Sequence, residues 1–286
     1  MKKLIDFIKE AEEKKVAIGH FNVSDIVGLK AVFAAARELN VPVIIGVSEG
    51  EWDFIGVRQI VALVKSLREE YGYPIFLNAD HTHSLEKLKE AIEAGFDAVM
   101  FDNSQLSLEG NIKKTKEVVE YVKNFNPEIL VEAELGNIKG SSTILLTSDV
   151  DNIKEGDLTK PNEAEQFIKE TGVDLFAPAV GNIHGLIING NPKLDIGRIK
   201  EIRKFAGIPL VLHGGSGIKD EDFSAAINAG ISVIHINTEL RVAWRKGMEA
   251  ALAQNPEEIV PYKILPKAVE EIEKVVEARL RLFNKI

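Results

Sequence analysis

Eight short apolar runs, rich in β-branched residues, recur at fairly even spacing and constrain the fold more than any other feature of the chain. They are Val16–Val23, Val41–Val47, Pro74–Ala79, Phe96–Phe101, Ile129–Leu135, Val173–Val180, Ile208–Leu212 and Ile231–Ile236. Each run has the length and composition of a buried strand. Segments with the helical period lie between them, such as Leu85–Ala94, Ile112–Val122, Glu163–Thr171 and Ile196–Phe205. This alternation predicts a parallel sheet covered by helices.

Eight such units favour a closed barrel over an open doubly wound sheet. An open sheet more often has five or six strands and a glycine-rich dinucleotide fingerprint after the first, whereas Phe21-Asn22-Val23-Ser24 stands here. We therefore predict an α/β fold, a (β/α)₈ TIM barrel, as one domain over residues 1–286. A short amphipathic helix is expected over Met1–Glu10. A longer one over Ile264–Phe283 would pack on the barrel or on a second subunit.

Composition excludes several classes of function. The formal charge of −9 provides no basic surface for nucleic acid. No apolar run reaches the length of about 20 residues that spans a bilayer, and charges interrupt the N-terminal apolar segment that a signal peptide would need. The chain has no cysteine, so a metal would sit on nitrogen and oxygen ligands. A cytoplasmic protein without membrane or nucleic-acid partners is expected.

Three of the six histidines follow predicted strands. His81 and His213 stand at strand ends, and His184 comes shortly after Val180. Active sites of (β/α)₈ barrels lie at the C-terminal ends of the strands. Any one of these histidines alone is more often a hydrogen-bonded residue without a metal. Their common placement favours one shared ion, because a catalytic zinc site uses three protein ligands and keeps one position open. Zinc is our first expectation, with another divalent ion as the alternative.

Carboxylates accompany these histidines. Asp80 precedes His81, so it could exchange a proton with a metal-bound substrate or support a histidine from behind. Glu132 and Glu134 share one face of their strand, since side chains alternate in a strand. Two carboxylates pointing into a barrel need partners because an unpaired buried charge is very costly. A metal with its histidines would serve, and so would a salt bridge to lysine or arginine.

Glycine-rich and capping residues follow the last two strands. Gly214-Gly215-Ser216-Gly217 could form an anion-binding nest or a plain loop, and Asn237-Thr238 could cap the next helix. Loops after strands seven and eight commonly hold phosphate in these barrels. The stretch from Lys139 to Pro161 is the longest irregular one, and loops of that length are usually functional lids.

Taken together, these residues resemble the class II fructose-bisphosphate aldolases, especially the shorter branch that includes tagatose-bisphosphate aldolases. The resemblance covers nearly the whole chain. The motifs that carry it are Phe21-Asn22-Val23, Gly46-Val47-Ser48-Glu49-Gly50, Asp80-His81, Glu90–Asp97, Val131–Gly136, Thr171–Asp174, His184-Gly185, Pro192-Lys193-Leu194, Leu212–Gly217 and Asn237-Thr238-Glu239.

The resemblance implies a metal-dependent aldolase that cleaves a ketose phosphate reversibly to dihydroxyacetone phosphate and an aldehyde through a metal-stabilised enediolate. Fructose 1,6-bisphosphate, giving glyceraldehyde 3-phosphate, is the expected substrate. Zinc would sit on His81, His184 and His213 near Glu134, with Asp80 as the acid/base for the C4 hydroxyl. The substrate-binding residues implied are Asn22, Ser48, Gly185, Gly214, Ser216, Asn237, Thr238 and, at the distal phosphate, Arg241. A monovalent cation near the phosphate and a homodimer or homotetramer are also implied.

The chain departs from the family pattern at several places. Lys139–Thr143 stands where a Gly-Gly-x-Glu-Asp loop supplies the carboxylate for the C3 proton, and Asp149, Asp151 or Glu155 could replace it. Leu186–Asn189 follows His184-Gly185 in place of Tyr-Lys, and Val233-Ile234-His235 replaces Lys-Ile-Asn. Thr82-His83 stands where a glycine often follows the Asp-His pair.

These departures leave two alternatives beside bisphosphate cleavage. One is a metal-dependent aldolase or epimerase acting on a less phosphorylated or unphosphorylated sugar, which Ile188 and His235 favour. The other is a non-catalytic barrel that binds a metal or a sugar phosphate, which the missing loop carboxylates favour.

Overall fold

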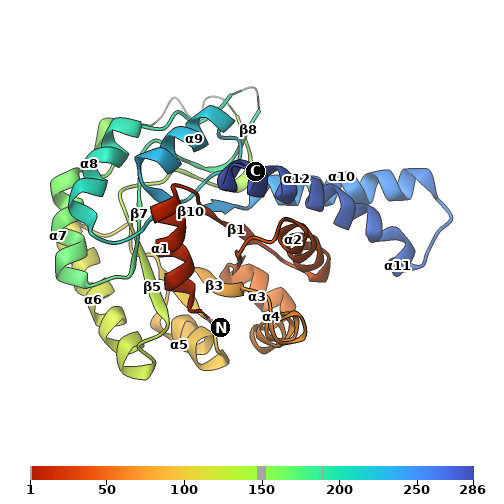
Figure 1. Ribbon diagram of the computed structural model, residues 1–286, viewed down its shortest axis with the longest axis horizontal. Helices are drawn as coiled ribbons and strands as arrows, with labels where there is room; N and C mark the ends of the chain where they lie inside the picture. The colour runs from red at the N-terminus through yellow and green to blue at the C-terminus, as the bar shows by residue number, and fades with distance from the viewer. Residues whose placement is uncertain (1, 147–152, 189) are drawn as a thin grey trace.

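A closed barrel of eight parallel strands forms the centre of the molecule in the computed structural model, which describes residues 2–146, 153–188 and 190–286 (Figure 1). Around the barrel the order is β1-β10-β9-β7-β5-β4-β3-β2. The bounds are β1 (Ile18–Asn22), β2 (Val43–Val47), β3 (Ile75–Thr82), β4 (Ala98–Phe101), β5 (Leu130–Leu135), β7 (Leu175–Pro178), β9 (Leu210–Leu212) and β10 (Ile231–Ile236). Each strand falls within or overlaps one of the eight predicted runs, so the predicted TIM barrel is confirmed.

Most of the helices cover the outside of the barrel, because they bury an apolar stripe against it. Their bounds are α1 (Leu4–Lys14), α2 (Ile26–Leu39), α3 (Glu49–Ile55), α4 (Val57–Tyr71), α5 (Leu85–Ala94), α6 (Leu108–Phe125), α7 (Pro161–Thr171), α8 (Ile196–Ala206), α9 (Asp220–Ala229), α10 (Thr238–Gln254), α11 (Pro261–Ile264) and α12 (Pro266–Asn284). Several end in a left-handed glycine cap, such as Gly95 after α5 and Gly172 after α7. None of the helices in the described part of the chain is long and apolar enough to cross a membrane.

The N-terminal helix α1 closes the end of the barrel opposite the strand C-termini. Its buried residues Leu4, Ile8 and Ala11 form a cluster with residues at the strand starts, among them Ile18 and Phe76. This cluster is separate from the larger core between strands and outer helices. The closed lower end leaves only the C-terminal ends of the strands open for a site.

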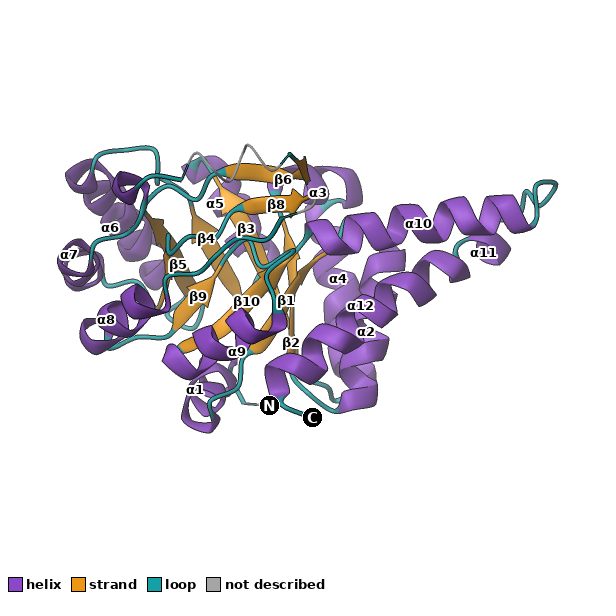
Figure 2. Cartoon of the chain, turned by 90° about the horizontal axis from the view of Figure 1, so that it is seen from above, coloured by secondary structure: helices purple, strands orange, loops and turns teal. Residues whose placement is uncertain are grey.

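The stretch from Lys139 to Pro161, which we predicted to be irregular, contains a strand. Residues Gly140–Leu145 form strand β6, which pairs in parallel with β8 (His184–Ile187) in a two-stranded sheet outside the barrel. A short 3₁₀ helix follows at Glu155–Asp157. The serine- and threonine-rich sequence of β6 gave no apolar alternation, because most of this strand is exposed. The small sheet lies across the barrel at the strand C-termini (Figure 2).

The C-terminal segment packs within its own chain, as one of the two expected arrangements. Helix α12 buries Ala268, Ile272, Val276 and Leu280, and it lies along α10 and α2. The far halves of α10 and α12, joined through α11, project from the barrel as an arm (Figures 1 and 2). Gly247 of α10 allows α12 to pack closely against α10, since a Cβ at this position would lie 2.5 Å from the Cα of Ala268.

Candidate metal centre and active site

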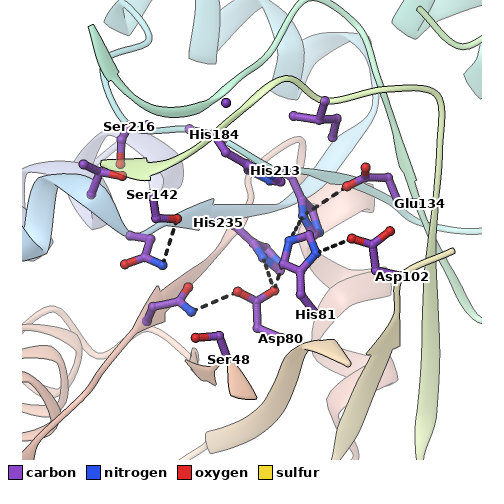
Figure 3. Close-up of a pocket in the computed structure, with 18 of the residues that line it drawn as sticks. Ser48, Asp80, His81, Asp102, Glu134, Ser142, His184, His213, Ser216 and His235 are labelled. Atoms are coloured by element: carbon purple, nitrogen blue, oxygen red, sulfur yellow. Dashed lines mark hydrogen bonds and ion pairs between the residues drawn. The ribbon is translucent and has the colours of Figure 1, made fainter. Parts of the chain in front are cut away.

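The metal ligands, the acid/base and the substrate-binding residues predicted from the sequence line one cavity at the C-terminal mouth of the barrel. They are Asn22, Ser48, Asp80, His81, Glu134, His184, Gly185, His213, Gly214, Ser216, Asn237, Thr238 and Arg241. They come from loops and strand ends that are far apart in the sequence, and Figure 3 shows the histidines and carboxylates turned toward one another. The fold therefore brings together what the sequence only suggested.

The three histidines form a compact group. The ring centroid of His81 lies 5.0 Å from that of His184 and 5.1 Å from that of His213. His81 has a left-handed backbone (φ 56°) where the pairing of β3 with β4 shifts register. A residue other than glycine held in this conformation is strained, and such strain tends to occur at functional sites. Here it turns the imidazole into the cavity.

Carboxylates fix the orientation of two rings. Nδ1 of His81 lies 3.0 Å from Asp102, and Nε2 of His213 lies 2.6 Å from Glu132. The remaining nitrogens, Nε2 of His81 and Nδ1 of His213, face each other at 3.2 Å. Two nitrogens bound to one tetrahedral zinc ion at about 2.0–2.1 Å would lie about 3.3 Å apart. The pair therefore fits a shared divalent ion, and the carboxylates behind the rings match the usual support of metal-bound histidines.

Glu134 and His184 complete the donor set. One ligand atom from each of His81, Glu134, His184 and His213 lies within 4.8 Å of the others. Glu134 is buried, and its Oε2 has no hydrogen-bond partner. This oxygen lies 3.6 Å from Nδ1 of His213, too far for a hydrogen bond, so its burial is costly and it too fits a cation at this position.

The electrostatics of this group also favour a cation. Burial lowers the pKa of His81, but nearby carboxylates, Asp80 foremost, outweigh it and raise that pKa to about 10. Burial and the neighbouring rings of His81 and His213 lower the pKa of His184 to about 3. Burial raises the pKa of Glu134 to about 7. Without a metal, a proton on His81 balances the carboxylates, and a divalent ion would displace it.

Asp80 sits beside this group with both oxygens directed by side chains. Its Oδ2 accepts a hydrogen bond from the Asn22 amide at 2.9 Å, and its Oδ1 lies 3.4 Å from Nδ1 of His235. Burial acts to raise the pKa of Asp80, but the charge of His81 and the contact with His235 hold it well below the usual value. Asp80 is thus a fixed carboxylate at the cavity wall.

A second pair of imidazoles lies next to Asp80: His20, which the sequence analysis did not place in the site, and His235, which it named as a departure from the family pattern. His20 and His235 stack with ring centroids 3.4 Å apart and 3° between their planes. Asn78 holds Nε2 of His20 at 3.1 Å. Gly46 leaves room for the stack, since a Cβ there would lie 2.1 Å from the His20 ring. Burial lowers the pKa of His20 to about 4, so the pair packs as neutral rings.

The glycine-rich turn after β9 is only partly available to an anion. The amide of Gly217 donates to Glu239 at 2.7 Å, and the amide of Gly215 donates to the carbonyl of His235. Within the described residues, the amides of Gly214 and Ser216 carry no hydrogen bond. They lie near the start of α10, where Asn237 occupies the N-cap position without a side-chain cap bond. The predicted nest is therefore smaller than four amides, because Glu239 fills one end.

Arg241, in the first turn of α10, lies between two other elements. Its guanidinium donates to Glu51 of α3 at 2.7 Å and to the Ser142 carbonyl of β6 at 2.9 Å. Glu51 is buried and also accepts from the backbone amide of Ser48 and the side chain of Asn22. Asn237 reaches Ser142 as well, at 3.4 Å. Arg241 is therefore engaged by the protein before any substrate arrives.

The proposed replacements for the loop carboxylate do not reach the site where the structure describes them. Glu155 is exposed and pairs with Arg198, and it does not line the cavity. Asp149, Asp151 and Asn189 lie outside the described residues. The carboxylates that line the cavity within the described residues are Asp80, Asp102 and Glu134.

Fold and site together define a class of protein: a (β/α)₈-barrel enzyme with histidine and carboxylate groups able to hold a metal at the mouth of the barrel. The sequence profile of "Fructose-bisphosphate aldolase class-II" matches residues 2–286. Fructose-bisphosphate aldolase of Geobacillus stearothermophilus is 39% identical over 283 residues, covering 98% of this chain and 95% of its own. That of Staphylococcus aureus strain Mu50 is 37% identical over 282 residues, covering 98% and 96%.

Solved structures agree. The YdjI aldolase of Escherichia coli K12 aligns with a TM-score of 0.83 and 30% identity, covering 98% of this chain and 96% of its own. The chain belongs to the class II fructose-bisphosphate aldolase family, a metal-dependent family of carbon–carbon lyases.

Proposed function

We propose that this protein cleaves a ketose phosphate reversibly to dihydroxyacetone phosphate and an aldehyde, with fructose 1,6-bisphosphate as the substrate that the names of its relatives indicate. The observation that carries the proposal is the convergence of His81, His184 and His213 beside the fixed carboxylate of Asp80. Metal ligands and a proton-transfer group within one cavity are the parts that retro-aldol chemistry requires.

His81, His184 and His213 would hold a divalent ion, zinc foremost, with Glu134 close enough to contact it. When bound, such an ion polarises carbonyl and hydroxyl oxygens and offsets negative charge that develops during cleavage. The role of Asp102 and Glu132 is to keep the unprotonated ring nitrogens of His81 and His213 directed into the cavity.

Asp80 would accept the proton of the C4 hydroxyl as the C3–C4 bond breaks, and return it in the condensation direction. Its low pKa keeps it ionised at neutral pH, which is the form that can accept a proton. Asn22 fixes its Oδ2, and Asn22 and Ser48 would contact substrate hydroxyls. The phosphate of the dihydroxyacetone end would be surrounded by Gly185, Gly214, Ser216, Asn237 and Thr238. The backbone amides of Gly214 and Ser216 carry no hydrogen bond and could donate to this anion.

We also propose that the enzyme is a cytoplasmic homodimer or homotetramer. The arm formed by α10, α11 and α12 exposes Ile259 and Tyr262 near its tip, with 86% and 75% of their surfaces accessible. Large exposed apolar side chains on a projecting element favour contact with a second copy of the chain.

The test is release of triose phosphate from fructose 1,6-bisphosphate and tagatose 1,6-bisphosphate by zinc-loaded protein, followed with a coupled dehydrogenase. We expect turnover with at least one sugar, and a loss of about 10²–10⁴-fold in kcat for Asp80→Asn. Absence of triose phosphate with both sugars would contradict bisphosphate cleavage. Turnover unchanged in Asp80→Asn would contradict the assigned proton transfer.

A further inference from the structure

The two ends of the cavity differ in their capacity to bind a phosphate. At the Gly214–Ser216 end, free amides and the N-terminus of α10 are available. On the side toward Ser48 and Ser142, Arg241 is the only lysine or arginine among the described residues lining the cavity. A substrate with phosphates at both ends would depend on this one guanidinium for its distal phosphate.

Arg241 is already paired with a buried carboxylate. Glu51 is 5% exposed and lies 2.7 Å from the guanidinium. Three further bonds hold the pair in place: Ser48 N–H and the Asn22 amide donate to Glu51, and Arg241 donates to the Ser142 carbonyl. The ion pair therefore lies directly behind the lining residues Asn22 and Ser48, and its net charge is zero.

The Glu51 carboxylate would oppose a phosphate brought to Arg241. A phosphate contacting the guanidinium would lie within a few ångströms of this carboxylate, where like charges repel strongly because little water screens them. Glu51 cannot turn away easily, since it is the N3 residue that accepts from the Ser48 backbone at the start of α3.

The space beyond the pair is also unsuited to a second phosphate. A neighbouring pocket shares Asn22, Asn237 and Arg241 with the site cavity. Its other lining residues are mostly apolar or acidic, namely Val23, Ser24, Asp25, Gly28, Glu51, Phe54, Leu240, Trp244 and Ile272. No second cation is present among these described residues to hold a dianion.

We infer that Glu51 makes the distal end of the site selective for an uncharged, hydroxyl-bearing aldehyde, so that the substrates used best carry one phosphate, at the dihydroxyacetone end. This inference rests on the proposed aldolase function and assigns Glu51 as its specificity-determining residue. Arg241 then neutralises Glu51 and contributes hydrogen bonds to hydroxyl groups, and a distal phosphate adds little to catalysis.

The test is condensation of dihydroxyacetone phosphate with racemic glyceraldehyde or racemic glyceraldehyde 3-phosphate, which differ only in the distal phosphate. For the zinc-loaded enzyme, we expect kcat/KM for glyceraldehyde 3-phosphate to exceed kcat/KM for glyceraldehyde by less than about tenfold. In Glu51→Gln, the ratio of kcat/KM for glyceraldehyde 3-phosphate to kcat/KM for glyceraldehyde should rise by about tenfold or more over wild type. Glu249→Gln is the matched control, because it removes the carboxylate that pairs with Arg245 on the exposed face of α10.

A wild-type preference of more than about tenfold for the phosphorylated aldehyde would overturn the inference while leaving the aldolase function intact. If neither aldehyde leads to consumption of dihydroxyacetone phosphate, the proposed function is overturned, and the inference with it. If Glu51→Gln does not fold, Glu51→Ala provides the second test. Its ratio of the two kcat/KM values should rise by about tenfold or more over wild type, and a ratio within about twofold of wild type would overturn the assignment of Glu51.

Discussion

Substitution of Glu132 by glutamine should weaken metal binding without touching a metal ligand. Glu132 is 1% exposed, and its carboxylate lies 2.6 Å from Nε2 of His213. A hydrogen bond to a charged group contributes about 1.5–3 kcal/mol, against about 0.5–1.5 kcal/mol for a neutral one. Glutamine keeps the size and one acceptor but removes the charge, so the loss is about 1–1.5 kcal/mol. We therefore expect zinc affinity to fall by about tenfold.

The measurement is competition between the protein and a chromophoric chelator for zinc at fixed pH. Glu128→Gln is the matched control, because Glu128 lies just before the same strand, is exposed and pairs with Lys3 on the surface. Its zinc affinity should equal that of wild type. A Glu132→Gln protein that is folded by circular dichroism and binds zinc as tightly as wild type would refute the assigned role of the carboxylate behind His213.

Three further predictions follow from the same contacts. Zinc affinity should fall by about tenfold per pH unit from pH 9 to 7, because the metal must displace the proton held by His81, whose pKa is raised to about 10. Below pH 7 the affinity should fall more steeply, because Glu134 becomes protonated as well. Chelator competition at each pH measures the affinity, and an affinity independent of pH would contradict the prediction. Gly46→Ala should lower the free energy of unfolding by about 1–3 kcal/mol, because its Cβ would overlap the His20 ring; urea denaturation measures the change, and wild-type stability would show that the stack is not packed as described. Ile259→Glu with Tyr262→Glu should shift the oligomer toward monomer in light scattering, whereas an unchanged mass would place the subunit interface elsewhere.

The barrel could be predicted because its strands are buried on both sides. Runs such as Val41–Val47 and Ile231–Ile236 are apolar at nearly every position, which distinguishes them from the amphipathic helices between them. Strand β6 could not be predicted in this way, since Gly140–Leu145 is mostly exposed and polar. Its pairing with β8 depends on tertiary contacts above the barrel mouth, and no local pattern records these.

The site could be predicted as far as the strand-end rule reaches. That rule pointed to His81 and His213, which both line the cavity, and it could also have found Asp102, which directly follows β4. The sequence analysis argued that the two buried carboxylates of this strand need partners, and His213 is the partner of Glu132. Glu51 carried no comparable signal, because it lies inside a helix and contacts the cavity-lining residues Asn22, Ser48 and Arg241 only through the way α3 packs.

Central to this account is one divalent ion, held by three histidines, that is required for cleavage. The most direct test is to strip the protein with a chelator and titrate zinc back while following release of triose phosphate from fructose 1,6-bisphosphate or a ketose 1-phosphate. Activity should vanish on stripping and return linearly until one zinc ion is bound per chain, and His184→Ala should neither bind that ion tightly nor recover. Activity that survives complete removal of metal, or that returns equally in His184→Ala, would contradict the account.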